Sequence, residues 1–247
     1  MRTPLSVVLV LLMVTTAAAG APVEYAIDDG DGNTNQGPPS TFDPDTLWGN
    51  CFEALPGGER ITTISVAFGP TFPTGGPVKV WLFDDPDDDS DPRNATPVAS
   101  ATAEYDGTSG DTFVSFAIDP TVVHGGFFVA ANAFLFGGVD RPLRVDTDSP
   151  GDRSWFFYDG EIDDVAGDLG TAAFGTRMDN PDFVIFPGAF MIRATGVPAA
   201  DFDGDGVVDG ADLAVLLSAW GGGAADLDGD GVTGGSDLAV LLSMWTR

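Results

Sequence analysis

Two short segments near the C-terminus place aspartates at a regular spacing, and each is followed by an apolar run. The first, DFDGDGVVDGAD, covers residues 201–212, and the second, DLDGDGVTGGSD, covers residues 226–237. Counted from the first aspartate, both carry carboxylates at positions one, three, five and twelve, with glycine at position six. This is the spacing of a calcium loop, in which alternate residues direct oxygens to one centre and glycine permits a sharp turn.

The spacing also predicts which residues would bind each ion. Ca²⁺ is a hard cation that takes six to eight oxygen ligands, among them the backbone carbonyl at position seven. For the first loop (201–212) the predicted ligands are Asp201, Asp203, Asp205, the Val207 carbonyl, Asp209 and Asp212. For the second loop (226–237) they are Asp226, Asp228, Asp230, the Val232 carbonyl and Asp237. Position nine of the second loop is Gly234, where water would replace a side chain. The sequence therefore predicts two calcium ions.

Crowded aspartates need a cation to hold such a loop closed. Two carboxylates about 5 Å apart repel each other by roughly 3 kcal/mol at an effective dielectric near 20. The alternative to a metal site is a disordered acidic turn, but two matches in register favour metal. Cys51 is the only cysteine, so no internal disulfide can stabilise so small a module. Metal binding would then supply folding free energy.

Each loop precedes an amphipathic run of helical period. The apolar positions are Leu213, Leu216, Leu217, Trp220, Leu238, Leu241, Leu242 and Trp245. Spacings of three, four and seven residues put each set on one helix face. We expect the two faces to pack on each other, and the alternative is a groove for a partner.

These two loop-plus-helix repeats resemble a type I dockerin. As in that family, position twelve is aspartate, and the segment GVPAA before the first loop cannot supply a preceding helix. The resemblance implies a small α-helical F-hand pair over residues 199–247 that binds two calcium ions and docks onto a cohesin domain. Positions ten and eleven, Gly210–Ala211 and Gly235–Ser236, depart from the Ser–Thr pairs of cellulosomal members.

Residues 22–198 show the alternation of half-buried antiparallel strands, punctuated by Gly, Pro and Asp turns. Segments 61–68, 78–83 and 112–118 carry apolar side chains at every second residue. The side chains expected on the core face are Ile64, Val66, Phe68, Val78, Val80, Leu82, Val114, Phe116 and Ile118. The pattern predicts a mainly β chain, an antiparallel β-sandwich of jelly-roll type being one form. GVPAA at 196–200 is expected to be a short linker, with the domain boundary near residue 198.

The N-terminal segment and the net charge limit the location and the partners. Residues 1–21 combine Arg2, an apolar stretch and a run of small residues, which is typical of a secretory signal peptide. The apolar stretch is about half of the roughly 20 residues that span a bilayer, so we expect a secreted protein without a membrane span. The net charge of −28 argues against nucleic-acid binding, which needs a basic surface.

Residues that could do chemistry in the N-terminal domain form no recognised motif. A lone turn histidine, His124, and the single Cys51 are more typical of structural roles than of nucleophilic catalysis. A glycoside hydrolase needs only two carboxylates, so a polysaccharide-active hydrolase carried by its dockerin stays open as the alternative.

Two further segments of this domain have a structural and a functional interpretation. Trp81 and the pair Trp155 and Phe157 in SWFFYDG predict either core packing or an aromatic platform for carbohydrate. The acidic segment 84–92 predicts a solvated turn, with a further calcium site as the alternative. The expected function is therefore non-catalytic: extracellular assembly or attachment through the tail, with a carbohydrate-binding or structural sandwich.

Overall fold

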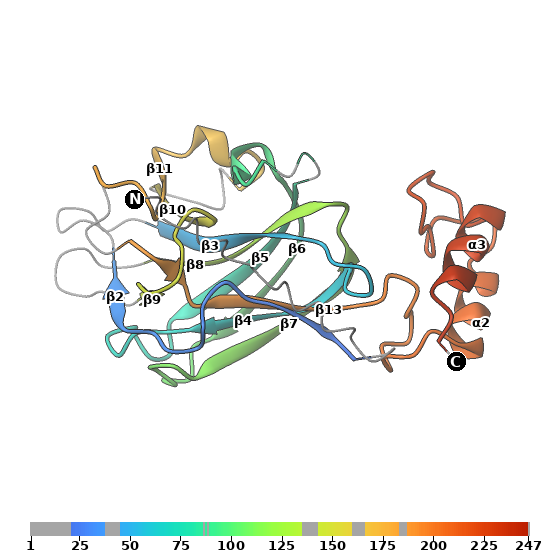
Figure 1. The fold of residues 1–247 in the computed structure, drawn as a ribbon, viewed down its shortest axis with the longest axis horizontal. Coiled ribbons are helices and arrows are strands. Elements are labelled where there is room, and N and C mark those ends of the chain that lie inside the picture. Colours follow the sequence, from blue (N-terminus) through green and yellow to red (C-terminus); the bar gives the residue numbers. More distant parts are fainter. Residues whose placement is uncertain are drawn as a thin grey trace, which may run out of the picture.

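The computed structural model describes residues 21–37, 45–85, 87, 89–134, 143–159, 166–182 and 187–246. Apart from Ala21, the predicted signal peptide lies outside these residues. Strands form the N-terminal part, and two short helices, α2 (Gly210–Ser218) and α3 (Gly235–Ser243), lie at the C-terminal end (Figure 1). No helix among the described residues is long and apolar enough to cross a membrane.

The strands form three antiparallel sheets. The four-stranded sheet has the order β1 (Val23–Tyr25), β13 (Ile192–Val197), β4 (Arg60–Ala67) and β7 (Phe113–Val122). The six-stranded sheet has the order β11 (Phe174–Arg177), β10 (Ser154–Asp159), β3 (Asp45–Glu53), β8 (Gly126–Phe134), β5 (Pro77–Asp85) and β6 (Thr96–Glu104). A small third sheet has the order β12 (Ala189–Phe190), β9 (Leu143–Asp146) and β2 (Thr34–Gln36).

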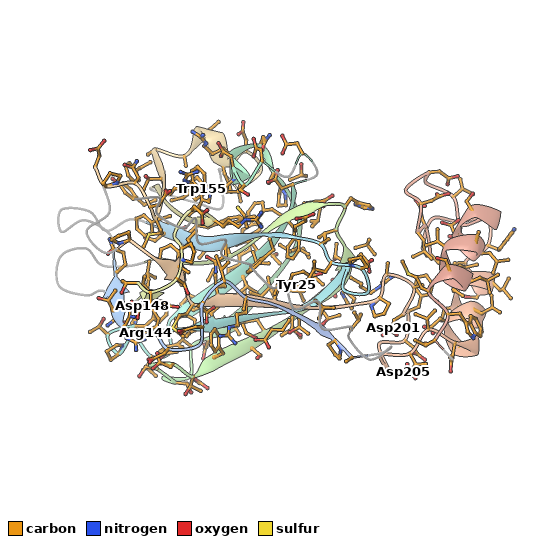
Figure 2. All side chains as sticks on the ribbon, in the orientation of Figure 1. Tyr25, Arg144, Asp148, Trp155, Asp201 and Asp205 are labelled. Atoms are coloured by element: carbon orange, nitrogen blue, oxygen red, sulfur yellow. The ribbon has the colours of Figure 1, made fainter. Side chains whose placement is uncertain are left out.

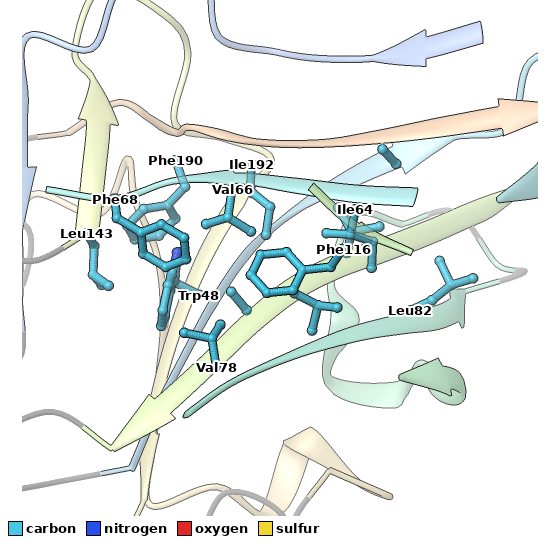
Figure 3. Packing of buried hydrophobic residues seen from close by; sticks show 14 of the residues in the cluster. Trp48, Ile64, Val66, Phe68, Val78, Leu82, Phe116, Leu143, Phe190 and Ile192 are labelled. Atoms are coloured by element: carbon cyan, nitrogen blue, oxygen red, sulfur yellow. The ribbon is translucent and has the colours of Figure 1, made fainter. Parts of the chain in front are cut away.

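The main hydrophobic core lies between the two larger sheets (Figure 3). Ile64 and Val66 of β4 and Phe116 of β7 contribute from the four-stranded sheet, and Val80 and Leu82 of β5 contribute from the six-stranded sheet. The predicted core-facing residues all lie in or against this cluster. The mainly β, antiparallel class is thus confirmed, and two sheets facing one core are compatible with a sandwich. Below, residues 22–198 are called the β-domain.

The six-stranded sheet is buried on its second face as well, as the core-packing interpretation of Trp81, Trp155 and Phe157 expects. Trp81, Phe83, Phe128, Trp155 and Phe157 form a second cluster there. The segments around two 3₁₀ turns, Pro92–Asn94 and Leu169–Thr171, contribute Ala95 and Leu169 to the same cluster. The half-buried β5 that period-two alternation predicts is therefore wrong, and two-sided burial of Trp81 is correct, because these segments cover the second face of the sheet.

The segment that joins the β-domain to the C-terminal module is not the separate linker that GVPAA predicts. Gly196 and Val197 belong to β13, and Ala199 and Ala200 are both buried. Ala200 lies in a small cluster with Leu216 of α2 and Leu241 of α3. Below, residues 199–247 are called the tail, and its core begins directly after the last strand.

Candidate metal centres

The first loop gathers three of its predicted ligands. Carboxylate oxygens of Asp201, Asp203 and Asp212 lie within 4.8 Å of one another. Asp201 accepts hydrogen bonds from the backbone N–H of Gly204 (2.8 Å) and Gly206 (2.9 Å), which curl the loop around it. Gly206 adopts a φ of 86°, the left-handed conformation that favours glycine at this turn. Figure 2 shows Asp201 and Asp205 beside the β-domain.

Asp212 closes the first loop from the helix side. Its Oδ1 accepts from the N–H of Phe202 (2.7 Å) and Asp203 (3.3 Å), and its Oδ2 accepts from the N–H of Asp209 (2.8 Å). The side chain is fully buried. Position twelve therefore ties both ends of the loop to the first turn of α2, where a carboxylate is also favoured by the helix dipole.

The second loop repeats this arrangement bond for bond. Oxygens of Asp226, Asp228 and Asp237 lie within 4.8 Å of one another. Asp226 accepts from Gly229 (2.8 Å) and Gly231 (2.7 Å), and Asp237 accepts from Leu227 (2.6 Å). Three like-charged groups converge twice on one small volume, with oxygen donors of the kind that Ca²⁺ prefers. The donor set therefore fits the predicted ion at both loops.

Three of the predicted carboxylate ligands lie outside these two groups. Asp205 accepts the N–H of Val207 at 2.8 Å, and Asp230 accepts the N–H of Val232 at 2.8 Å. Asp209 is the N-cap of α2 and accepts the N–H of Ala211 at 2.7 Å. Each therefore makes a local hydrogen bond of the Asx type. Their roles as ligands, and those of the Val207 and Val232 carbonyls, stay predictions.

The carboxylates of the two loops differ in their electrostatics. Burial raises the pKa of Asp201, and the nearby carboxylates of Asp212 and Asp203 add to this rise. Burial also acts to raise the pKa of Asp237, but its backbone donors, Leu227 foremost, outweigh burial and leave the pKa below its usual value. The two loops therefore differ in how burial and backbone hydrogen bonds balance at a carboxylate: burial dominates at Asp201, and the hydrogen bonds dominate at Asp237.

The helix stripes pack on each other only in part. Leu216 and Leu241 are fully buried in the tail core, and Leu213 and Leu238 pack against it. In contrast, Leu217 is 52% exposed and Leu242 is 53% exposed. Trp220 and Trp245, which follow the helices, are also exposed. Helices of nine residues are too short to cover both stripes, so the outer half of each stripe faces solvent.

Sequence reasoning missed one residue beside the first loop, Arg60 of the β-domain. Its Nε and Nη2 donate to the Ala199 carbonyl at 3.0 and 2.7 Å, and its guanidinium lies 4.9 Å from the centre of the Phe202 ring. The only sequence signal was negative: residues 199–246 contain no Lys, Arg or His. The acidic loops and helices of residues 199–246 therefore contain no basic side chain of their own.

The expectations for the N-terminal acidic segment and its neighbours have mixed outcomes. Asp85, Asp87 and Asp89 bring carboxylates within 4.8 Å of one another, but such groupings are common without an ion, so calcium there stays a prediction.

Exposed His124 contacts Asp84 through its backbone N–H (2.9 Å) and its Nδ1 (3.3 Å). Burial, followed by the charge of Asp85, raises the pKa of Cys51 well above its usual value, which disfavours a reactive thiolate.

The aromatic residues considered as a platform are buried. Trp81 is 9% exposed and Trp155 is 6% exposed, and Phe157 has no exposed surface. The core-packing interpretation is thus correct, because the segments of the two 3₁₀ turns cover this face. The Trp155 indole N–H donates to the Ser90 carbonyl at 2.8 Å, and the Arg93 guanidinium lies 5.4 Å from its ring centre.

A cavity of about 730 Å³ lies over Trp155 and β11. Its polar walls include two arginine–aspartate pairs, Arg93 with Asp91 and Arg177 with Asp179. Hydrogen bonds from Arg93 are the largest influence on the pKa of Asp91, and they lower it.

No protein-family model and no curated protein sequence matches this chain.

Proposed function

We propose that the tail is a calcium-binding, dockerin-like module that attaches an exported protein, with a β-sandwich as its main domain, to a partner outside the cell. The observation that carries this proposal is that both loops bring three carboxylates within 4.8 Å and repeat the same backbone hydrogen bonds to positions one and twelve. One convergent acidic turn arises easily by chance. Two copies, each followed by an equivalent helix, favour a duplicated module in which each loop binds a calcium ion.

Exposed apolar side chains support a docking role for the tail. Among the described residues, seven of the nine exposed large apolar side chains lie in it: Val207, Val215, Leu217, Trp220, Val232, Leu242 and Trp245. Such a concentration on so small a module is typical of a protein interaction surface. With nine aspartates and no basic residue over 199–246, the tail fits a partner with apolar and basic groups. The proposed partner is a cohesin-like domain.

Docking should depend on both calcium and this apolar surface. In a pull-down with a panel of cohesin domains, the full chain is expected to bind in calcium and to lose binding in excess chelator. Leu217→Ser should weaken binding about five- to thirtyfold, because an exposed interface leucine contributes of order 1–2 kcal/mol. Val98→Ser, at an exposed position of the β-domain, is the matched control. Calcium-independent binding, or equal effects of both variants, would contradict the docking role.

The β11 cavity favours saccharide binding as a second function. Arg93 and Arg177 are neutralised by their own aspartates, so the cavity suits a neutral ligand rich in hydroxyl groups better than an anion. Hydrolysis is less well supported, because a general acid needs a raised pKa and that of Asp91 is lowered.

Saccharide binding is tested on a panel of soluble polysaccharides with the full chain. Arg177→Ala is expected to weaken retention at least about tenfold through the loss of charged hydrogen bonds. Asp119→Ala, on exposed β7 surface, should have no effect. Reducing-sugar release that disappears in Asp91→Asn would instead establish the hydrolase. Absence of both retention and release would leave the β-domain a structural carrier.

A further inference from the structure

The β-domain contacts the tail through a side chain at the start of β4. Arg60 pairs across the sheet with Val197, the last residue of β13, so it lies where the chain leaves the β-domain (Figure 1). Two of its N–H groups converge on the Ala199 carbonyl, and its planar guanidinium covers the Phe202 ring. A planar donor fork that also stacks on an aromatic ring is particular to arginine.

The same residues connect Arg60 to the first loop. Phe202, beneath the guanidinium, donates its N–H to Asp212 at 2.7 Å, and Asp201 lies between Phe202 and buried Ala200. Burial lowers the pKa of Arg60, while the charges of Asp201 and Asp212 act to raise it. The half-buried guanidinium thus lies near the carboxylates that are predicted to bind calcium, and their charges favour its charged form.

Among the described residues, no arginine makes such a contact with the second loop. Leu227 occupies the position of Phe202 and makes the equivalent hydrogen bond to Asp237 at 2.6 Å. Its side chain is aliphatic, whereas Phe202 offers a ring on which the Arg60 guanidinium lies. The two loops therefore share their internal geometry and differ in their attachment to the β-domain.

Calcium in the first loop is compatible with this contact. The loop carries five aspartates, so one bound dication leaves three negative charges beside Arg60. The cation also removes the repulsion that opens the loop, and the closed loop is the form that presents Ala199 and Phe202 to Arg60.

We propose that Arg60 is the positioning residue that docks the calcium-loaded first loop onto the β-domain, so that calcium converts a tethered tail into one held at a fixed orientation. This inference rests on the proposed calcium function. Linkage is reciprocal, so docking by Arg60 raises the calcium affinity of the first site and leaves the second site unchanged. A fixed tail would hold its apolar surface in one orientation relative to the β-domain.

The experiment compares the full chain with Arg60→Gln and Arg60→Lys by ¹⁵N relaxation and calcium titration. In calcium, tail and β-domain amides of the unsubstituted chain should tumble with one correlation time. In Arg60→Gln, tail amides should tumble faster although the tail stays folded, and first-site affinity should fall by about five- to tenfold. Arg60→Lys retains the positive charge but loses the two-pronged hydrogen bonds to Ala199 and the stacking on Phe202. Compared with Arg60→Gln, it should recover part of the first-site calcium affinity but not the shared tumbling of tail and β-domain.

Arg153→Gln, in the turn directly before β10 and outside the lining of the β11 cavity, is the matched control and should behave as the unsubstituted chain. The inference is overturned if the tail of Arg60→Gln tumbles together with the β-domain, or if both sites weaken equally. Those outcomes leave calcium binding intact, so they do not count against the proposed function. Failure of the unsubstituted chain to bind calcium overturns both.

Discussion

Removal of calcium is expected to unfold residues 199–246 while the β-domain stays folded. The tail core is a small cluster around Leu216 and Leu241, and three carboxylates converge in each loop. Without a cation, repulsion within each triplet opposes a core too small to compensate for it. Hydrogen exchange of the full chain in excess chelator should therefore show loss of protection in α2 and α3, with β3, β4 and β8 unchanged.

The control for this experiment replaces the chelated calcium with excess magnesium. Mg²⁺ demands near-ideal octahedral geometry and gives up its water reluctantly, so it should restore protection poorly. Equal protection of the helices in chelator and in calcium would contradict coupled folding. Loss of protection in the β-domain as well would contradict the separate stability of the two parts.

Substitution of position twelve is expected to abolish calcium binding at one site and to spare the other. In Asp212→Ala the first loop loses a ligand, and three backbone N–H groups lose the acceptor that joins both ends of the loop. A hydrogen bond to a charged group contributes about 1.5–3 kcal/mol, so the affinity should fall at least about a hundredfold. Calorimetric titration of the full chain should then find one remaining site.

Asp237→Ala is the matched variant, because Asp237 makes equivalent bonds to Leu227, Asp228 and Gly234 in the second loop. It should remove the second site and preserve the first. Two variants that each retain both sites would show that position twelve is not a ligand. Two variants that each lose both sites would show that the loops fold only as a pair.

The loops were predictable because their geometry is local. The backbone N–H groups that bond the carboxylates of Asp201 and Asp212 all lie within 201–212, so spacing alone could place Asp201, Asp203 and Asp212 together. The strand faces were predictable for a similar reason, since period-two alternation already separated the core-facing Val80 and Leu82 of β5 from their neighbours.

What the sequence could not predict depends on contacts between distant segments. The burial of Trp81 and Trp155 depends on segments around residues 92–95 and 169–172 that fold over the six-stranded sheet. Arg60 reaches the Ala199 carbonyl across 139 residues of sequence, and no spacing rule pairs a strand's first residue with a loop that far along the chain. Long-range packing decided both features.

Calorimetric titration of the full, unsubstituted chain with Ca²⁺ tests the central claim most directly. If the two triplets of converging carboxylates are metal centres, the titration should give a binding heat and a stoichiometry of about two ions per chain. A titration without heat, in a chain whose helices are already protected from hydrogen exchange, would contradict it: the repeated loops would then be acidic turns, stabilised by their own backbone hydrogen bonds.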